Sequence, residues 1–146
     1  MERFGVLLTE AGMARMPARV FACILAEDAG RLTAAELAER LEVSPAAISG
    51  AVRYLTQARM VVRGREPGER RDHYAVHEDV WTDMYVSRMA LLATWERALD
   101  EGVQLLGLDR PAGRRLAETR AFFAFLQSEV PEIIRRWDAH KARHGI

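Results

Sequence analysis

The sequence has little that would suit a secreted, membrane or catalytic protein. Its single cysteine, Cys23, cannot form an internal disulfide, so we expect a reducing, cytoplasmic location. No apolar run reaches the roughly 18 residues of a transmembrane helix, and the first residues are too polar for a secretory signal. Gly-rich phosphate loops, Gly-x-Ser-x-Gly and His-Glu-x-x-His are absent. We therefore predict no enzyme, no cofactor, no metal and no membrane partner.

Net charge is also lacking, because 21 basic residues balance 21 acidic residues in 146. Proteins that bind nucleic acid over a large surface are usually basic overall, so zero net charge argues against that class. A compact reader of DNA needs only a local basic patch. About half of the residues are apolar, which is enough for one packed domain with an extension.

The chain is organised around the stretch 32–76. A first helix begins at Thr33, where Thr33 and Glu36 form a Thr-x-x-Glu capping box. Its apolar stripe consists of Leu37, Ala38 and Leu41. The sequence then breaks at Glu42 and Val43, which predicts a turn before the next helix.

A second helix is predicted over residues 45–58. Ser44 is a good N-cap, and Pro45 suits the first helical position because its missing N–H has no partner there. The predicted inward face consists of Ile48, Ala51, Val52 and Leu55. The outward face and its edges carry Ala46, Ala47, Ser49, Gly50, Arg53, Tyr54 and Gln57.

The charge around this second helix is of one sign. Residues 43–65 contain no acid and four arginines, namely Arg53, Arg59, Arg63 and Arg65. A helix that lies in a DNA major groove needs small or hydroxyl residues near base edges and arginines near phosphates. The pattern therefore favours DNA binding.

A β-hairpin is predicted after the second helix. Residues 60–62 begin a strand, residues 66–69 have the composition of a turn, and residues 73–76 make the return strand. Arg70 and Arg71 lie near the tip, where they could reach a DNA backbone or minor groove.

These motifs resemble the winged helix-turn-helix of MarR-type bacterial transcription regulators, and most of all the GbsR-like branch. The resemblance rests on Leu-Thr-x-x-Glu-Leu-Ala-x-x-Leu-x-Val-Ser-x-x-x-Ile-Ser-x-x-Val-x-x-Leu and on the wing pattern that ends at Tyr74. Glu69 and Arg71 occupy the places of an Asp-x-Arg pair that stiffens many family wings, and Glu42 stands where many turns have Gly.

The resemblance implies a mainly α protein with a small β-wing and a long helical dimerisation arm. It further implies a homodimeric regulator, most often a repressor, that binds a pseudo-palindromic double-stranded DNA operator and responds to a small-molecule effector. The sequence itself does not separate repression from activation. The residues expected at the DNA are Ser44, Ala46, Ala47, Ser49, Gly50, Arg53, Tyr54, Arg63, Arg65, Arg70, Arg71 and His73.

Three segments are expected: 1–16 as an N-terminal helix that joins the dimer arm, 17–78 as the winged domain, and 79–146 as long helices for dimerisation. A helix over 2–11 precedes one that begins at Pro17 and buries Val20, Phe21, Ile24 and Leu25. After an N-cap at Asp79 and a linker at 107–113, the last helix should kink or break at Val130 because Pro131 follows.

Several residues leave two interpretations open. Cys23 is either an oxidant sensor or, as we favour, a small buried apolar residue. His140 and His144 have the spacing of a metal-binding pair, but favourable charge at a helix end explains them. The aromatic and methionine group at 81–89 is either the wall of a ligand pocket or plain core. The alternative function is a winged protein-interaction module without DNA binding.

Overall fold

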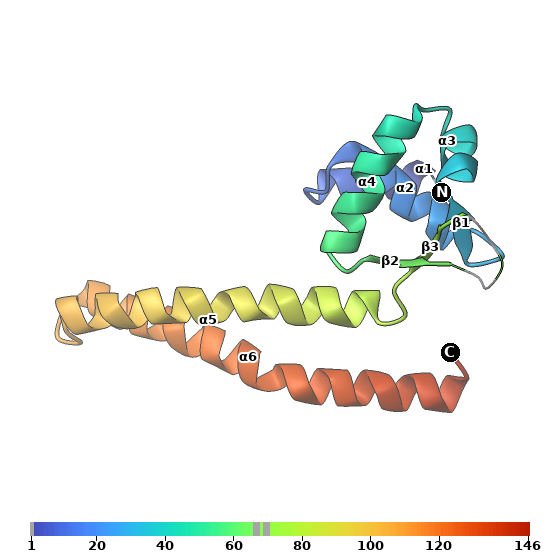
Figure 1. Ribbon diagram of the computed structural model, residues 1–146. Coiled ribbons are helices and arrows are strands. Elements are labelled where there is room, and N and C mark those ends of the chain that lie inside the picture. Colours follow the sequence, from blue (N-terminus) through green and yellow to red (C-terminus); the bar gives the residue numbers. More distant parts are fainter. Residues whose placement is uncertain (1, 66–67, 69–70) are drawn as a thin grey trace. The chain divides into compact units, whose positions relative to one another are not determined.

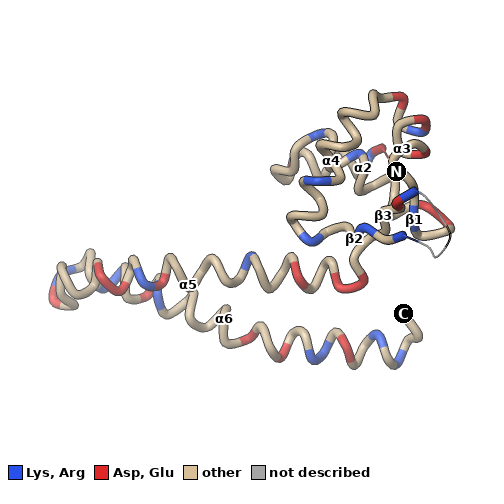
Figure 2. Tube along the Cα trace, in the orientation of Figure 1, with Lys and Arg blue, Asp and Glu red and all other residues tan. Residues whose placement is uncertain are grey.

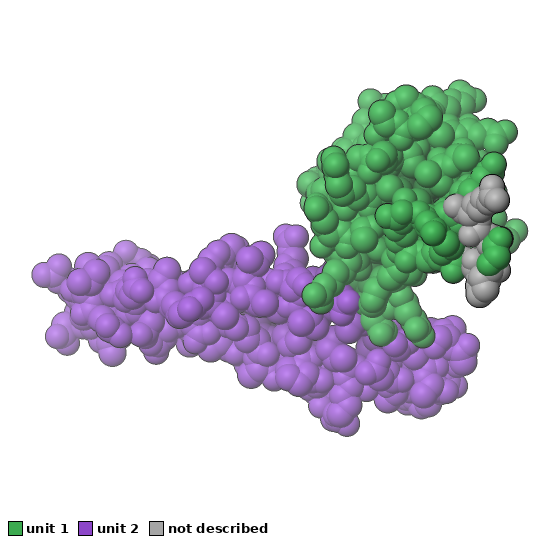
Figure 3. Space-filling view, viewed as in Figure 1, with its two compact units in different colours: residues 1–80 green, residues 81–146 purple. Residues whose placement is uncertain are grey.

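The chain forms six helices and three short strands within residues 2–65, 68 and 71–146, which the computed structural model describes (Figure 1). The chain divides into two units, residues 1–80 and 81–146, which are coloured separately in Figure 3. The mainly helical fold with a small β-wing, expected from the sequence, is confirmed.

The first two helices, α1 (Glu2–Glu10) and α2 (Arg15–Leu25), pack on each other. α2 begins two residues before Pro17, which therefore lies in the first turn, where a missing N–H breaks no helical hydrogen bond. Val20, Phe21 and Ile24 are buried as predicted. The prediction was wrong for Leu25, which is 39% exposed because it is the last residue of α2, where the chain leaves the core.

The predicted helix-turn-helix is α3 (Ala34–Leu41) followed by α4 (Pro45–Gln57). The capping box is confirmed, since Thr33 N–H donates to Glu36 Oε2 over 2.7 Å and Glu36 N–H donates to Thr33 Oγ1 over 3.3 Å. Glu42 ends α3 with φ 53° and ψ 48°, a left-handed conformation that glycine usually supplies. A glutamate thus makes the turn geometry that the sequence left open.

The sheet has three strands, one more than the predicted hairpin. β3 (His73–Val76) lies in the centre and pairs antiparallel with both β2 (Val61–Gly64) and β1 (Arg31–Thr33). β1 was not predicted, because a strand of three residues gives no clear sequence pattern. Its pairing partner β3 lies about forty residues further along the chain, so no local pattern indicates the pairing.

The core of this unit lies between the helices and the sheet. Its largest fully buried side chains come from α2, α3, α4, β2 and residue 80, and they include Phe21, Ile24, Leu37, Ile48, Leu55, Val61 and Val80. The four residues predicted for the inward face of α4 are all buried. This packing fixes α4 by one face and leaves its opposite face exposed.

The second unit is a helical hairpin of α5 (Val80–Leu106) and α6 (Pro111–His144). α5 begins directly after Asp79, and the loop between the helices, residues 107–110, is shorter than the predicted linker because Pro111 opens α6. Gly113 is required there, since a Cβ atom on it would lie 1.9 Å from the Gly107 carbonyl oxygen.

Side chains tie the two long helices together. Arg120 of α6 pairs with Asp100 of α5, Gln127 donates to Glu96 over 2.8 Å, and the Trp95 and Phe123 rings lie 5.7 Å apart. A kink or a break was expected at Val130, and α6 continues through Pro131 without a break, while its ribbon bends along the way (Figure 1). No helix within the described residues is long and apolar enough to cross a membrane.

Candidate nucleic-acid interface

The exposed face of α4 presents the small and basic residues that the sequence singled out. Ala46, Ser49, Arg53 and Tyr54 are exposed, and Ala47 and Gly50 are half-buried. Within the part of the chain that the structure describes, no atom outside α4 lies within 4 Å of a Cβ atom built on Gly50, so another molecule can approach the backbone closely there. Figure 2 shows basic residues and no acidic residues along α4 and β2.

The start of α4 is fixed by its cap. Ser44 Oγ accepts a hydrogen bond from Ala47 N–H over 3.3 Å, and Pro45 follows at the first helical position. Ser44, predicted to face DNA, is exposed, and its hydroxyl also caps the first turn of the helix. The small residues of the outward face begin directly after this turn.

A groove of about 310 Å³ runs between α4 and the sheet. The structure brings three predicted residues together in it, Ser49, Arg53 and Arg63. The groove is also lined by four residues that were not among those expected at the DNA, namely Val52, Thr56, Gln57 and Tyr74. Gln57 was already placed on the outward face of the helix, and helical spacing from Ser49 and Arg53 would have added Val52 and Thr56. Hydroxyl, amide and guanidinium groups in one groove are suited to hold a phosphate backbone.

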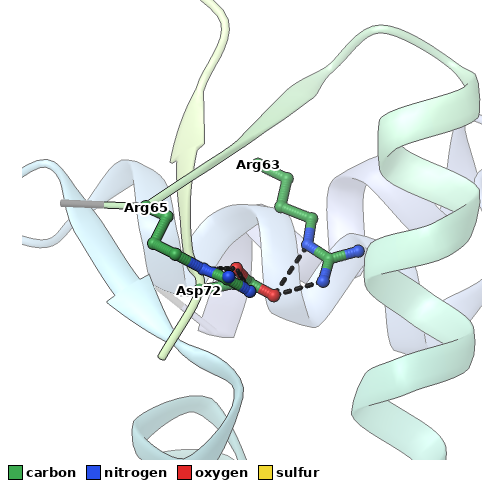
Figure 4. Close-up of polar contacts among 3 residues, drawn as sticks. All are labelled: Arg63, Arg65 and Asp72. Atoms are coloured by element: carbon green, nitrogen blue, oxygen red, sulfur yellow. Dashed lines mark hydrogen bonds and ion pairs between the residues drawn. The ribbon is translucent and has the colours of Figure 1, made fainter. Parts of the chain in front are cut away.

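Arg63 and Arg65 of the predicted site meet on one carboxylate, that of Asp72 (Figure 4). Arg63 Nε donates to Asp72 Oδ2 over 2.9 Å with Nη2 on the same oxygen, and Arg65 Nε donates to Oδ1 over 2.8 Å. Hydrogen bonds from Arg63 and then Arg65 hold the pKa of Asp72 below its ordinary value. Sequence analysis missed Asp72.

The signal for Asp72 is the strand register. Gly64 pairs with His73, so one step further along the ribbon Arg65 and Asp72 lie opposite each other. The register depends on the loop between the strands, and composition alone did not fix it. Once the register is known, the ion pair between Arg65 and Asp72 across the two strands can be predicted.

The remaining wing residues are placed differently. The His73 ring lies across Gly64, where an added Cβ atom would come within 2.6 Å of His73 Nε2, and its Nδ1 is buried without a hydrogen-bond partner among the described residues. Arg71 is exposed and close enough to Glu36 to lower the pKa of that carboxyl, after the larger effect of Thr33. Arg70, the Glu69 position and most of the predicted turn lie outside the described residues.

The geometry at Cys23 and at the pair His140 and His144 favours the simpler of the two interpretations for each. Burial raises the pKa of the half-buried Cys23 thiol, which disfavours the reactive thiolate. The His140 and His144 rings are stacked with centroids 4.1 Å apart, and His144 Nδ1 lies 2.9 Å from the carbonyl oxygen of His140. In the structure these two rings therefore contact each other and the helix backbone.

Comparison with known proteins adds independent information. A sequence profile of the MarR family matches residues 11–72, and a profile of the MmpR5-like MarR family transcriptional regulators matches residues 79–140. The HTH-type transcriptional regulator MmpR5 of Mycobacterium tuberculosis is 26% identical over 138 residues, which are 94% of this chain and 84% of that protein. A crystal structure of a transcriptional regulator superposes with a TM-score of 0.73 at 26% identity, covering 94% of this chain and 95% of the other.

Proposed function

The chain belongs to the MarR family of winged helix-turn-helix transcriptional regulators, and we propose that it is a sequence-specific repressor that binds a pseudo-palindromic operator as a homodimer. As a member of this family it is a DNA-binding regulator and not an enzyme. The repressor role, the operator symmetry and a cytoplasmic location are part of the proposal.

One observation carries the proposal: α4 exposes a face of small and basic residues beside a groove lined by Arg53 and Arg63. We place α4 in the major groove, where Ala46, Ala47, Ser49, Gly50 and Arg53 approach base edges. The rest of the interface would hold phosphates or enter the minor groove, and it consists of Ser44, Tyr54, Arg63, Arg65, Arg70, Arg71 and His73.

The homodimer is supported by the helical unit. Its two helices leave large apolar side chains exposed, including Leu91, Trp95, Phe122 and Phe125. The rings of Trp95 and Phe122 both lie beside that of Phe123, so part of this apolar surface is continuous, and such surface is usually covered by a partner chain. We propose that residues 79–146 dimerise with help from residues 1–16, while residues 17–78 bind DNA.

Two finer assignments are also proposals. Since MarR-type proteins respond to ligands, a small-molecule effector would act by changing the spacing of the two recognition helices, which meet successive major grooves about 34 Å apart. A GbsR-like placement within the family stays a prediction from the wing pattern of the sequence.

Selection of binding sites from a random duplex pool tests the proposed function. We expect an inverted repeat with half-sites about one helical turn apart, bound with an affinity that falls steeply with salt as counterions are released. If a folded dimer enriches no DNA sequence, and if salt does not weaken whatever DNA binding is found, a protein-interaction module would be supported instead.

A further inference from the structure

Four side chains share the face of the β2–β3 ribbon that borders the groove beside α4. Arg63 pairs with Tyr74, and two residues further out Arg65 faces Asp72, so alternation places all four on the same side. Arg63 and Tyr74 line the groove itself. An acidic residue therefore lies within the proposed phosphate-binding surface, where it would repel a DNA backbone.

The Asp72 carboxylate is covered by the two arginines rather than by the core. Its side chain is 20% exposed, whereas those of Arg63 and Arg65 are each 59% exposed. Both carboxylate oxygens are used, Oδ2 by Arg63 and Oδ1 by Arg65. The two guanidinium groups thus remain accessible to DNA, but in the free protein they converge on one point and carry a combined charge of +1 with Asp72.

Such a cluster treats two kinds of DNA differently. On random DNA, binding is almost entirely electrostatic, and an arginine must leave Asp72 to contact a phosphate fully. On the operator, α4 is docked in the major groove, so arginines held at a defined place meet phosphates without further ordering of their side chains. A group that penalises the wrong partner more than the right one raises specificity.

We propose that Asp72 is a specificity-determining residue, which holds Arg63 and Arg65 back from the phosphates of non-operator DNA. This inference rests on the proposed function, because it assumes that the wing arginines contact DNA. Asp72 acts through the two arginines and touches no base.

The test is the Asp72→Asn variant, which keeps the shape of the side chain and removes its charge. Affinity for a random-sequence duplex and for the duplex enriched by selection is measured over a range of salt concentrations. For each arginine that gains a phosphate, the log–log salt slope for random DNA should become more negative by about 0.9. If wild type and variant bind equally at 1 M salt, this slope change makes the variant bind random DNA about eightfold more tightly at 0.1 M, one decade lower. Operator affinity should change less, so the ratio of the two affinities falls.

Two controls separate this effect from a simple change of net charge. Glu78→Gln removes an exposed acid in the turn after β3 and should leave both affinities close to wild type. In an Arg63→Gln, Arg65→Gln background, Asp72→Asn should no longer strengthen random-DNA binding. An equal gain in that background, or a gain matched by Glu78→Gln, would overturn the proposal.

A further measurement does not depend on the folding of the Asp72 variant. With Asp72 in place, Arg63→Gln combined with Arg65→Gln should weaken operator binding and leave the random-DNA salt slope almost unchanged. A slope that becomes less negative by about 1.8 would mean that both arginines already contact random DNA, and the proposal would be wrong. Wild-type protein that binds no duplex in a salt-dependent manner would refute the proposed function instead.

Discussion

The two units of the chain differ in how they treat their apolar residues. Among the described residues, fourteen of the fifteen buried apolar side chains belong to residues 1–80, and Leu92 alone belongs to residues 81–146. Large exposed apolar side chains within the described ranges show the opposite distribution, with five in the first unit and eleven in the second. The winged unit therefore has its own core, and the helical hairpin has side chains suited to an interface.

This difference follows from how many layers each unit has. The winged unit encloses its core between helices α2 to α4 and a three-stranded sheet. A hairpin of two helices can bury only the stripe where the helices meet, so apolar residues on their other faces stay exposed. Apolar residues thus stabilise one unit internally and remain largely exposed on the other.

Replacing one leucine by alanine in each unit should give the largest difference in the free energy of unfolding. Leu37 of α3 is fully buried, so Leu37→Ala should lower the free energy of unfolding by about 2–5 kcal/mol through lost burial and a residual cavity. Leu105 of α5 is 86% exposed, so Leu105→Ala should change it by about 0.5 kcal/mol or less. Urea denaturation followed by circular dichroism measures both.

Repeating these titrations at several protein concentrations sharpens the contrast. A deficit for Leu37→Ala that is constant with concentration reports the winged core, whereas an effect of Leu105→Ala that varies with concentration reports association. Equal costs for the two variants at all concentrations would contradict the separation into a core and an interface.

The exposed aromatic residues of α6 should matter to association rather than to folding of the winged unit. Phe122 and Phe125 are each more than half exposed, and covering a phenylalanine in an interface contributes about 1.5–3 kcal/mol. Each alanine variant should therefore weaken dimerisation roughly ten- to hundredfold, as measured by sedimentation equilibrium. Val62→Ala, an exposed apolar change in the winged unit, should leave dimerisation unchanged; dissociation by this control would contradict the assignment.

The winged unit could be predicted best where a feature depends on residues close together in the sequence. The capping box at Thr33, the Ser44 and Pro45 start of α4, and the buried face of α4 were all confirmed. These depend on neighbours within one or two helical turns, which the sequence displays directly.

The features that could not be predicted depend on contacts with residues far away in the sequence. β1 exists because it pairs with β3, and Asp72 matters because the register sets Arg65 opposite it. At Pro131 the sequence left a kink and a break open, and the packing of α6 decides between them: the helix continues on both sides, because a proline can be accommodated by a bend. The separation of buried from exposed apolar residues in α5 and α6 likewise requires the packing of one helix on the other.

Arg53→Ala should weaken DNA binding without affecting the core. Arg53 is exposed on α4, so its loss should leave the free energy of unfolding within about 0.5 kcal/mol of wild type. Loss of a base contact should cost about 1–3 kcal/mol in operator binding and relax specificity at one base pair. Fluorescence anisotropy with the selected site and its single-base variants measures this. Arg115→Ala, the same charge change in α6, serves as the control, and normal operator binding by Arg53→Ala would refute the docking of α4.

Thr33→Ala should have the smallest effect and should act through the capping box of the winged unit. Losing the side-chain cap of α3 costs about 1 kcal/mol. Thr94→Ala, an exposed change within α5, should cost nothing because alanine is the better helix former. Equal costs for the two variants would mean that the cap does not contribute.

The same cap makes a pH dependence that can be followed at one carboxyl. Hydrogen bonds from the Thr33 N–H and then its hydroxyl hold the pKa of Glu36 below its ordinary value of 4.5. A depressed carboxyl pKa contributes stability above pH 4.5, and this contribution is lost as the pH falls through the lower folded value. Thr33→Ala removes the hydroxyl but keeps the backbone donor, so an NMR titration should find the Glu36 pKa moved only part of the way back. A complete return would show that the hydroxyl, rather than the backbone N–H, dominates the cap.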